Sequence, residues 1–168
     1  MLSQKAKYAL KAMLALASQP SGELLQAQDI ANRQNIPKKF LDLILIDLRR
    51  NGLVHSQRGK HGGYVLGRPA ENITFAQVIR IIDGPLAPIP CASLTGYRRC
   101  ADCKDEKACG VRIVMREVRD AVASILDATT LSSLGGGKLV DALATDGAEA
   151  APKPVRKRAP NKVAASVS

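Results

Sequence analysis

Aromatic residues are scarce in this chain: they make up 3% of its 168 residues, and tryptophan is absent. Proteins that bind single-stranded nucleic acids rely on stacking of bases on aromatic side chains, so the composition argues against that class. No apolar run approaches the roughly 18 residues that span a bilayer. The N-terminal segment is interrupted by Lys5, Lys7 and Lys11, where a signal peptide has an unbroken apolar stretch. We therefore expect a cytoplasmic protein without a membrane partner.

Histidine is scarcer still, with only His55 and His61 present. An enzyme that uses a cysteine nucleophile needs a base, most often His, close to the thiol. All four cysteines lie between residues 91 and 109, well away in sequence from both histidines. The sequence therefore predicts that the chain is not an enzyme.

Positive charge is abundant and unevenly spread. The formal net charge is +10, and residues 33–68 alone hold eight Lys or Arg against two Asp. A basic excess concentrated in one stretch predicts a polyanionic partner, most simply double-stranded DNA.

Apolar periodicity, helix-start residues and Gly or Pro breakers divide the first half of the chain into short elements. The predicted elements are helices over residues 3–18, 26–34 and 37–51, strands over residues 53–57 and 64–66, and a helix over residues 74–82. We expect the third helix to bury Phe40, Leu41, Ile44, Leu45 and Leu48. Three helices followed by a hairpin is the order of a winged helix-turn-helix, so the fold class predicted is mostly α with a two-stranded wing.

The second helix of such a motif lies in the major groove. This placement puts Lys38, Lys39 and Asp42 at the groove, with Arg49 and Arg50 farther along. A carboxylate at position 42 can accept a hydrogen bond from cytosine N4, whereas the lysines can donate to guanine or to phosphates. Alternatively, Asp42 only balances Lys38 four residues away on a solvated helix face. The sequence leaves both roles of Asp42 open.

The turn of the hairpin carries Arg58, Lys60 and His61 among three glycines. Glycine permits turns with positive φ and close approach of the backbone to a ligand. An arginine on such a tip can enter a narrow minor groove; the alternative is an ordinary tight hairpin with solvated charges. The other candidate DNA contacts in this region are Ser56, Gly62, Gly63 and Tyr64.

Several of these segments resemble one known family. The stretch SQRGKHGGYVLGRPAENITFAQVIRIIDG, residues 56–84, is similar to the wing and following helix of the Rrf2 family of bacterial winged-helix transcription regulators. KYALKAMLALA (residues 7–17) and IPKKFLDLILIDLRRNGLV (residues 36–54) also resemble that family, and the likeness covers about residues 1–134. The resemblance implies a homodimer that binds a palindromic operator, with a long C-terminal helix, residues 111–129, pairing between subunits.

The cysteines form a compact cluster of candidate metal ligands. Cys91, Cys100, Cys103 and Cys109 follow the spacing C-x8-C-x2-C-x5-C. Clustered thiols in a cytosolic protein indicate metal or redox chemistry more often than structural disulfides, and thiolates suit both iron–sulfur clusters and zinc. From the residues alone, an iron–sulfur cluster, a zinc site and thiol redox switching without a cofactor all stay open.

The resemblance favours the iron–sulfur cluster, because the family's iron–sulfur members have a similar Cys103 to Cys109 spacing before the long helix. It implies Cys91, Cys103 and Cys109 as ligands. Two features depart from that pattern: Cys100 is an extra thiol, and Arg112 stands where those members have a histidine ligand. The fourth ligand is therefore open between Cys100, a group from the other subunit and an external molecule.

These observations divide the chain into four predicted parts. They are a DNA-binding domain over residues 1–84, a cysteine-rich cofactor loop over 85–109, a part over 110–145 with the dimerisation helix and a short helix at 138–144, and a disordered basic tail over 146–168. We expect a sequence-specific transcription regulator, a repressor, that senses through an iron–sulfur cluster. The alternatives are a regulator stabilised by zinc or switched by thiol oxidation, or a role in binding a metabolic enzyme.

Overall fold

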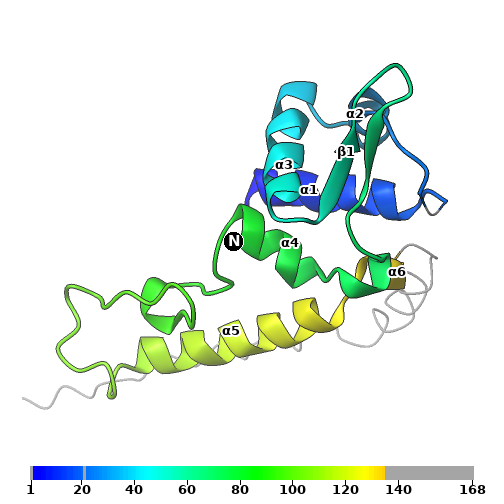
Figure 1. Ribbon diagram of the computed structural model, residues 1–168. Coiled ribbons are helices and arrows are strands. Elements are labelled where there is room, and N and C mark those ends of the chain that lie inside the picture. Colours follow the sequence, from blue (N-terminus) through cyan, green and yellow to red (C-terminus); the bar gives the residue numbers. More distant parts are fainter. Residues whose placement is uncertain (1, 21, 135–168) are drawn as a thin grey trace, which may run out of the picture.

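The computed structural model describes residues 2–20 and 22–134, and Figure 1 shows the arrangement of their helices and strands. The elements are α1 (Gln4–Ala17), α2 (Ala27–Gln34), α3 (Lys38–Arg50), β1 (Val54–Gln57), β2 (Gly63–Leu66), α4 (Phe75–Ile82), α5 (Gly110–Ala128) and α6 (Leu131–Leu134). Two 3-10 turns, Ala70–Asn72 and Pro90–Ala92, complete them. The predicted order of three helices, a hairpin and further helices is confirmed.

Helix starts coincide with residues that satisfy free backbone N–H groups. The Ser3 Oγ accepts a hydrogen bond from the N–H of Ala6 at 3.0 Å and caps α1. Thr74 and Gln77 form a reciprocal capping box at the start of α4. The third helix differs: Pro37 is the N-cap of α3 and makes no side-chain hydrogen bond, so α3 begins one residue later than predicted. These local signals explain why the predicted bounds differ from the observed ones by at most one residue.

One hydrophobic core joins α1, α2, α3, β1 and α4. Four side chains on the inner face of α3 are fully buried: Leu41, Ile44, Leu45 and Leu48. Phe40 was expected among them, but this prediction is wrong, because its side chain is exposed. The four inner positions supply the buried face of α3, and Phe40 lies at the side of the helix, between the buried face and the outer face.

The hairpin is antiparallel, with Val54 opposite Leu66 and Gln57 opposite Gly63. Figure 1 shows its turn at the same end of the molecule as the first turn of α3, away from α4 and α5. This end therefore combines the two elements that the sequence predicts to contact DNA.

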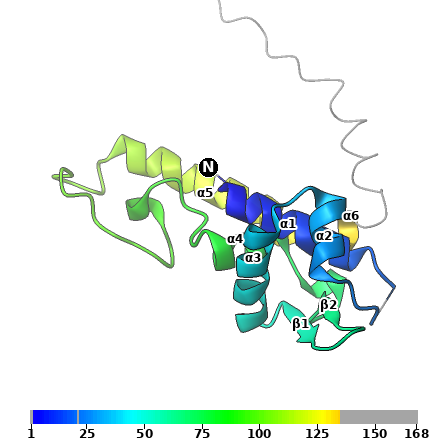
Figure 2. The same cartoon turned by 90° about the horizontal axis from the view of Figure 1, so that it is seen from above.

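The chain leaves this unit through the loop that holds the cysteines, and α5 brings it back. In Figures 1 and 2, α5 runs past α4, with the loop folded against its N-terminal end. At the other end, the N–H of Leu131 donates to the carbonyl of Ile73 at 2.9 Å, and the Leu131 side chain is buried in the core. The short helix α6 was not predicted. The helix expected over 138–144 and the tail expected to be disordered lie outside the described residues.

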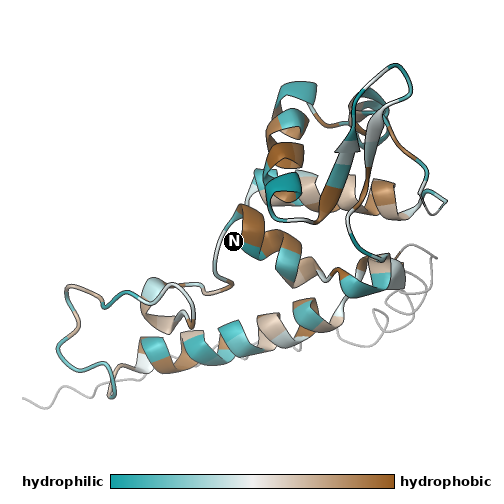
Figure 3. Cartoon of the chain, in the orientation of Figure 1, coloured by the Kyte–Doolittle hydropathy of each residue, from teal (hydrophilic) through white to brown (hydrophobic). Residues whose placement is uncertain are grey.

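The apolar positions of α5 are largely uncovered in the single chain. Brown and teal segments alternate along this helix in Figure 3. Its exposed apolar residues include Val111, Val114, Val118, Val122 and Ile125. Arg119 is the only buried residue of α5. Within the described ranges, no helix has the length and apolar character needed to cross a membrane.

Candidate DNA interface and cysteine segment

The outer side of α3 presents a row of cations. Burial of the inner leucines and isoleucine leaves Lys38, Lys39, Arg49 and Arg50 exposed along the helix. The guanidinium of Arg49 donates to the Ser56 hydroxyl at 3.3 Å and so connects α3 to strand β1. Arg49 and Ser56, two predicted DNA contacts from the helix and the hairpin, therefore lie next to one another.

Asp42 is paired with Lys38. The Lys38 Nζ lies 2.8 and 3.0 Å from the two carboxylate oxygens, and both side chains are about half exposed. This is the arrangement expected if Asp42 balances the charge of a lysine one turn away. An exposed pair of this kind contributes little to stability, so it can separate when a base edge competes for either partner. The base-reading role of Asp42 stays a prediction.

The wing turn is shaped by its glycines. Gly59 has a φ of +116°, a region that side-chain-bearing residues rarely adopt, and its carbonyl accepts from the N–H of Gly62 at 3.0 Å. A Cβ on Gly63 would lie 2.8 Å from the carbonyl oxygen of Leu25. The turn carries Arg58, Lys60 and His61 into solvent.

The wing is anchored by a pairing that the sequence did not reveal. Leu25, before α2, exchanges two backbone hydrogen bonds of 2.9 Å with Tyr64 of β2. The Leu25 side chain is buried in the core. This single residue adds a third, very short strand to the hairpin and fixes it to the helix-turn-helix. No local pattern marks an isolated bridge of this kind.

The four cysteines are free thiols, and the nearest thiol neighbour of Cys100 is Cys91, while that of Cys103 is Cys109. Cys91 is buried in the 3-10 turn, and the other three are half-buried. Contact with the Cys91 thiol, followed by desolvation, raises the pKa of Cys100 to about 11. Desolvation, followed by contact with Cys109, raises the pKa of Cys103 above its ordinary value. Both shifts favour neutral thiols in the metal-free chain.

The donor set fits an iron–sulfur cluster or zinc by its chemistry, since both prefer thiolates. The positions of these side chains in the single chain do not yet form a metal site. Across residues 2–20 and 22–134, no three His, Cys, Asp or Glu side chains converge as a ready metal site. The cysteine segment therefore has to rearrange before three or more of its thiols share a metal centre.

Two arginines of α5 hold the turn that contains Cys91, a role that no sequence pattern indicated. Arg112 Nε donates to the carbonyl of Cys91 at 2.9 Å. The buried Arg119 donates to the carbonyl of Ala92 and to the carboxylate of Asp120. Arg112, which departs from the family's iron–sulfur pattern, thus binds the backbone at Cys91.

The rest of the loop is braced by polar contacts. The Tyr97 hydroxyl donates to Glu106 at 2.5 Å, which raises the pKa of Tyr97, and Arg99 donates to the carbonyl of Cys103 at 3.4 Å.

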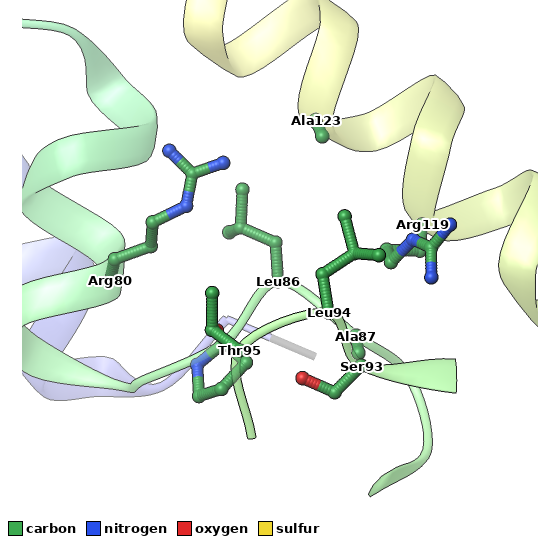
Figure 4. Close-up of a pocket in the computed structure, with 9 residues that line it drawn as sticks. Arg80, Leu86, Ala87, Ser93, Leu94, Thr95, Arg119 and Ala123 are labelled. Atoms are coloured by element: carbon green, nitrogen blue, oxygen red, sulfur yellow. The ribbon is translucent and has the colours of Figure 1, made fainter. Parts of the chain in front are cut away.

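Figure 4 shows Arg80 of α4 and Arg119 of α5 on opposite sides of a small pocket, with Leu86 and Leu94 between them. Its volume of about 70 Å³ is far below that of typical small-molecule sites.

Comparison with known proteins decides the family. The sequence model of Rrf2, described as an iron-dependent transcriptional regulator, matches residues 2–136. The chain belongs to the Rrf2 family. Among its relatives, the HTH-type transcriptional regulator CymR of Bacillus subtilis is 34% identical over 79% of this chain and 88% of CymR. IscR of Escherichia coli O1:K1 is 32% identical over 79% of this chain and 78% of IscR.

Solved structures agree with this membership. B. subtilis CymR, described as the global cysteine regulator, superposes with a TM-score of 0.66 at 33% identity, over 80% of this chain and 95% of CymR. T. potens IscR gives a TM-score of 0.64 at 25% identity, over 91% and 93%. The expected winged-helix fold is confirmed, and this Rrf2 protein is an HTH-type transcription regulator of a DNA-binding family rather than an enzyme.

Proposed function

We propose that two copies of this Rrf2 protein bind a palindromic duplex operator in the cytoplasm and act there as a repressor. The observation that supports this most is that the first turn of α3, which carries Lys38 and Lys39, lies at the same end of the winged-helix unit as the wing turn (Figure 1). Cations that contact phosphates provide affinity, whereas contacts from helix and wing provide sequence choice.

The uncovered face of α5 supports dimerisation. Its row of exposed valines, from Val111 to Val122, recurs every three or four residues over a helix of 19 residues. Pairing of two such faces removes apolar surface from water, which is the main driving force for association. A pair of α5 helices sets the distance between two winged-helix units and hence the spacing of the half-sites.

The cysteine segment supports a sensing role. In this proposal Cys91, Cys103 and Cys109 hold an iron–sulfur cluster, with Cys100 as a candidate fourth ligand. A cluster held there would supply redox-sensitive chemistry, and Cys109, the N-cap of α5, would connect it to the start of that helix. Arg112 and Arg119 fix the backbone beside Cys91, so a rearrangement of the segment is passed directly to α5.

A second candidate is regulation by the thiols themselves. The specific observation in its favour is the pairing of Cys91 with Cys100 and of Cys103 with Cys109. Oxidation of one pair to a disulfide releases two protons and two electrons, which a peroxide takes up as it is reduced. A related structure is described as the oxidized form of CymR from Staphylococcus aureus.

Anaerobic purification with a visible spectrum and analysis of iron, sulfide and zinc separates these candidates. A brown protein with iron and sulfide supports the cluster. A colourless protein with zinc supports the structural metal, and a metal-free protein whose duplex binding responds to peroxide supports thiol regulation.

A further inference from the structure

The outward ridge of α3 is apolar at its centre. Leu43 is 59% exposed, Ile46 is 36% exposed and Phe40 is 57% exposed. The core does not need these side chains, because Leu41, Ile44, Leu45 and Leu48 already fill the inner face with no exposure at all. A helix that contacted only phosphates would present polar or charged groups here.

The helical repeat places Leu43 in the middle of the outer face. Lys39 lies four residues before it, Ile46 three residues after it and Arg50 seven residues after it, so all four share one side of α3. Leu43 is the sixth of 13 residues and therefore belongs to the half of the helix nearer its N-terminus. In a helix-turn-helix that half contacts base edges.

We propose that Leu43, supported by Ile46, contacts the C5-methyl group of a thymine in each half-site and thereby selects the operator sequence. This inference rests on the proposed function and identifies one base that the recognition helix reads. The thymine methyl is the apolar group that base edges present in the major groove. Burial of Leu43 against it removes two apolar surfaces from water.

The charges around the ridge favour DNA over a protein as the occupant. Lys39 and Arg50 flank Leu43 on the helix, and the wing turn, which carries Arg58 and Lys60, lies at the same end of the unit as the first turn of α3. An apolar strip bordered by cations complements a groove whose walls are phosphates and whose floor holds methyl groups.

The test uses the full chain and DNA that lacks single methyl groups. Duplexes are first enriched from a random pool by binding to the protein. Each thymine of the enriched half-site is then replaced by deoxyuridine, which keeps the base pair and removes only the methyl. Affinities are measured for wild type, Leu43→Ala and Leu43→Met; thermal denaturation checks that the variants fold, which their exposed position favours.

We expect one thymine per half-site at which replacement by deoxyuridine weakens wild-type binding about fourfold. Replacement in both half-sites should weaken binding about 15-fold. Leu43→Ala abolishes that sensitivity, whereas Leu43→Met retains part of it. The inference is overturned if deoxyuridine has no effect at any thymine, or if Leu43→Ala leaves every effect intact. Failure to enrich any duplex would overturn the proposed DNA-binding function itself, so the two failures are distinguishable.

Discussion

The guanidinium Nε of Arg112 lies 2.9 Å from the carbonyl oxygen of Cys91, a hydrogen bond between residues 21 positions apart. It joins α5 to the turn that carries the one buried cysteine. A hydrogen bond from a charged donor contributes about 1.5–3 kcal/mol. Arg112→Ala is therefore expected to lower the free energy of local opening at Cys91 by about 1–3 kcal/mol.

Hydrogen exchange measures this effect. Amides of residues 91–93 should exchange faster in Arg112→Ala than in wild type. Arg116→Ala, at an exposed position of the same helix, serves as the matched control. Equal exchange in the two variants would show that Arg112 does not hold the turn.

A second prediction concerns the ion pair between α4 and α5. The Arg80 guanidinium binds both carboxylate oxygens of Asp127, at 2.6 and 2.8 Å, and its hydrogen bonds lower the pKa of Asp127 below the ordinary value. A lowered carboxyl pKa stabilises the fold above the pKa of the unfolded chain, and this contribution is lost as the pH falls through the folded value. Because both groups are substantially exposed, the pair is worth at most about 1 kcal/mol.

Urea unfolding of wild type and Asp127→Asn tests this prediction. The wild type should be slightly more stable at neutral pH, and the difference should shrink between about pH 5 and about pH 2. Glu117→Gln, at an exposed position of α5, controls for loss of a negative charge. A difference independent of pH would contradict the assigned ion pair.

The cysteine pairs predict unequal reactivity in the reduced, metal-free chain. Contact with Cys91 raises the pKa of Cys100 to about 11, against an ordinary value of 9.0. Since only the thiolate reacts, its fraction at mildly alkaline pH is about 100-fold smaller than for a free thiol. We expect slow alkylation of Cys100 by iodoacetamide, with a rate that rises with pH toward 11.

Mass spectrometry of alkylation time courses gives the rate at each cysteine. Cys91→Ser removes the neighbouring thiol, the largest cause of the shift, and should speed the reaction of Cys100. Alkylation of wild-type Cys100 at the rate of a free thiol would rule out the pairing.

The wing makes a prediction about affinity. Arg58→Ala is expected to weaken operator binding by about 1–3 kcal/mol if this side chain enters a groove. Arg68→Ala removes the same charge from an exposed position beyond β2, at the far end of the hairpin. It should cost less and act equally on all duplexes. Fluorescence anisotropy with specific and unrelated duplexes compares the two, and equal losses would show that the wing acts only through its charge.

The sequence was sufficient wherever local chemistry decides structure. Ser3 and Thr74 mark helix starts because their side chains cap backbone N–H groups, and the glycines around Arg58 mark the wing turn. The predicted burial of Phe40 was wrong, because α3 has apolar residues on several sides. Periodicity alone does not identify which of them pack into the core.

The contacts that position the candidate sites join residues far apart in sequence, so local sequence patterns could not predict them. Leu25 pairs with Tyr64, and Arg112 with Cys91, only because the tertiary fold brings distant segments together. The spacing of the cysteines identified a thiol cluster, but the arrangement in two pairs depends on the path of the whole loop.

The central claim is that a dimer of this Rrf2 protein binds duplex DNA under control of its cysteine segment. The most direct measurement is the affinity and stoichiometry of the full chain on an enriched duplex, compared between the reduced metal-free protein and protein reconstituted with iron and sulfide. We predict two chains per palindromic duplex and affinities that differ between the two states. A monomer that binds all duplexes equally weakly in both states would contradict the account.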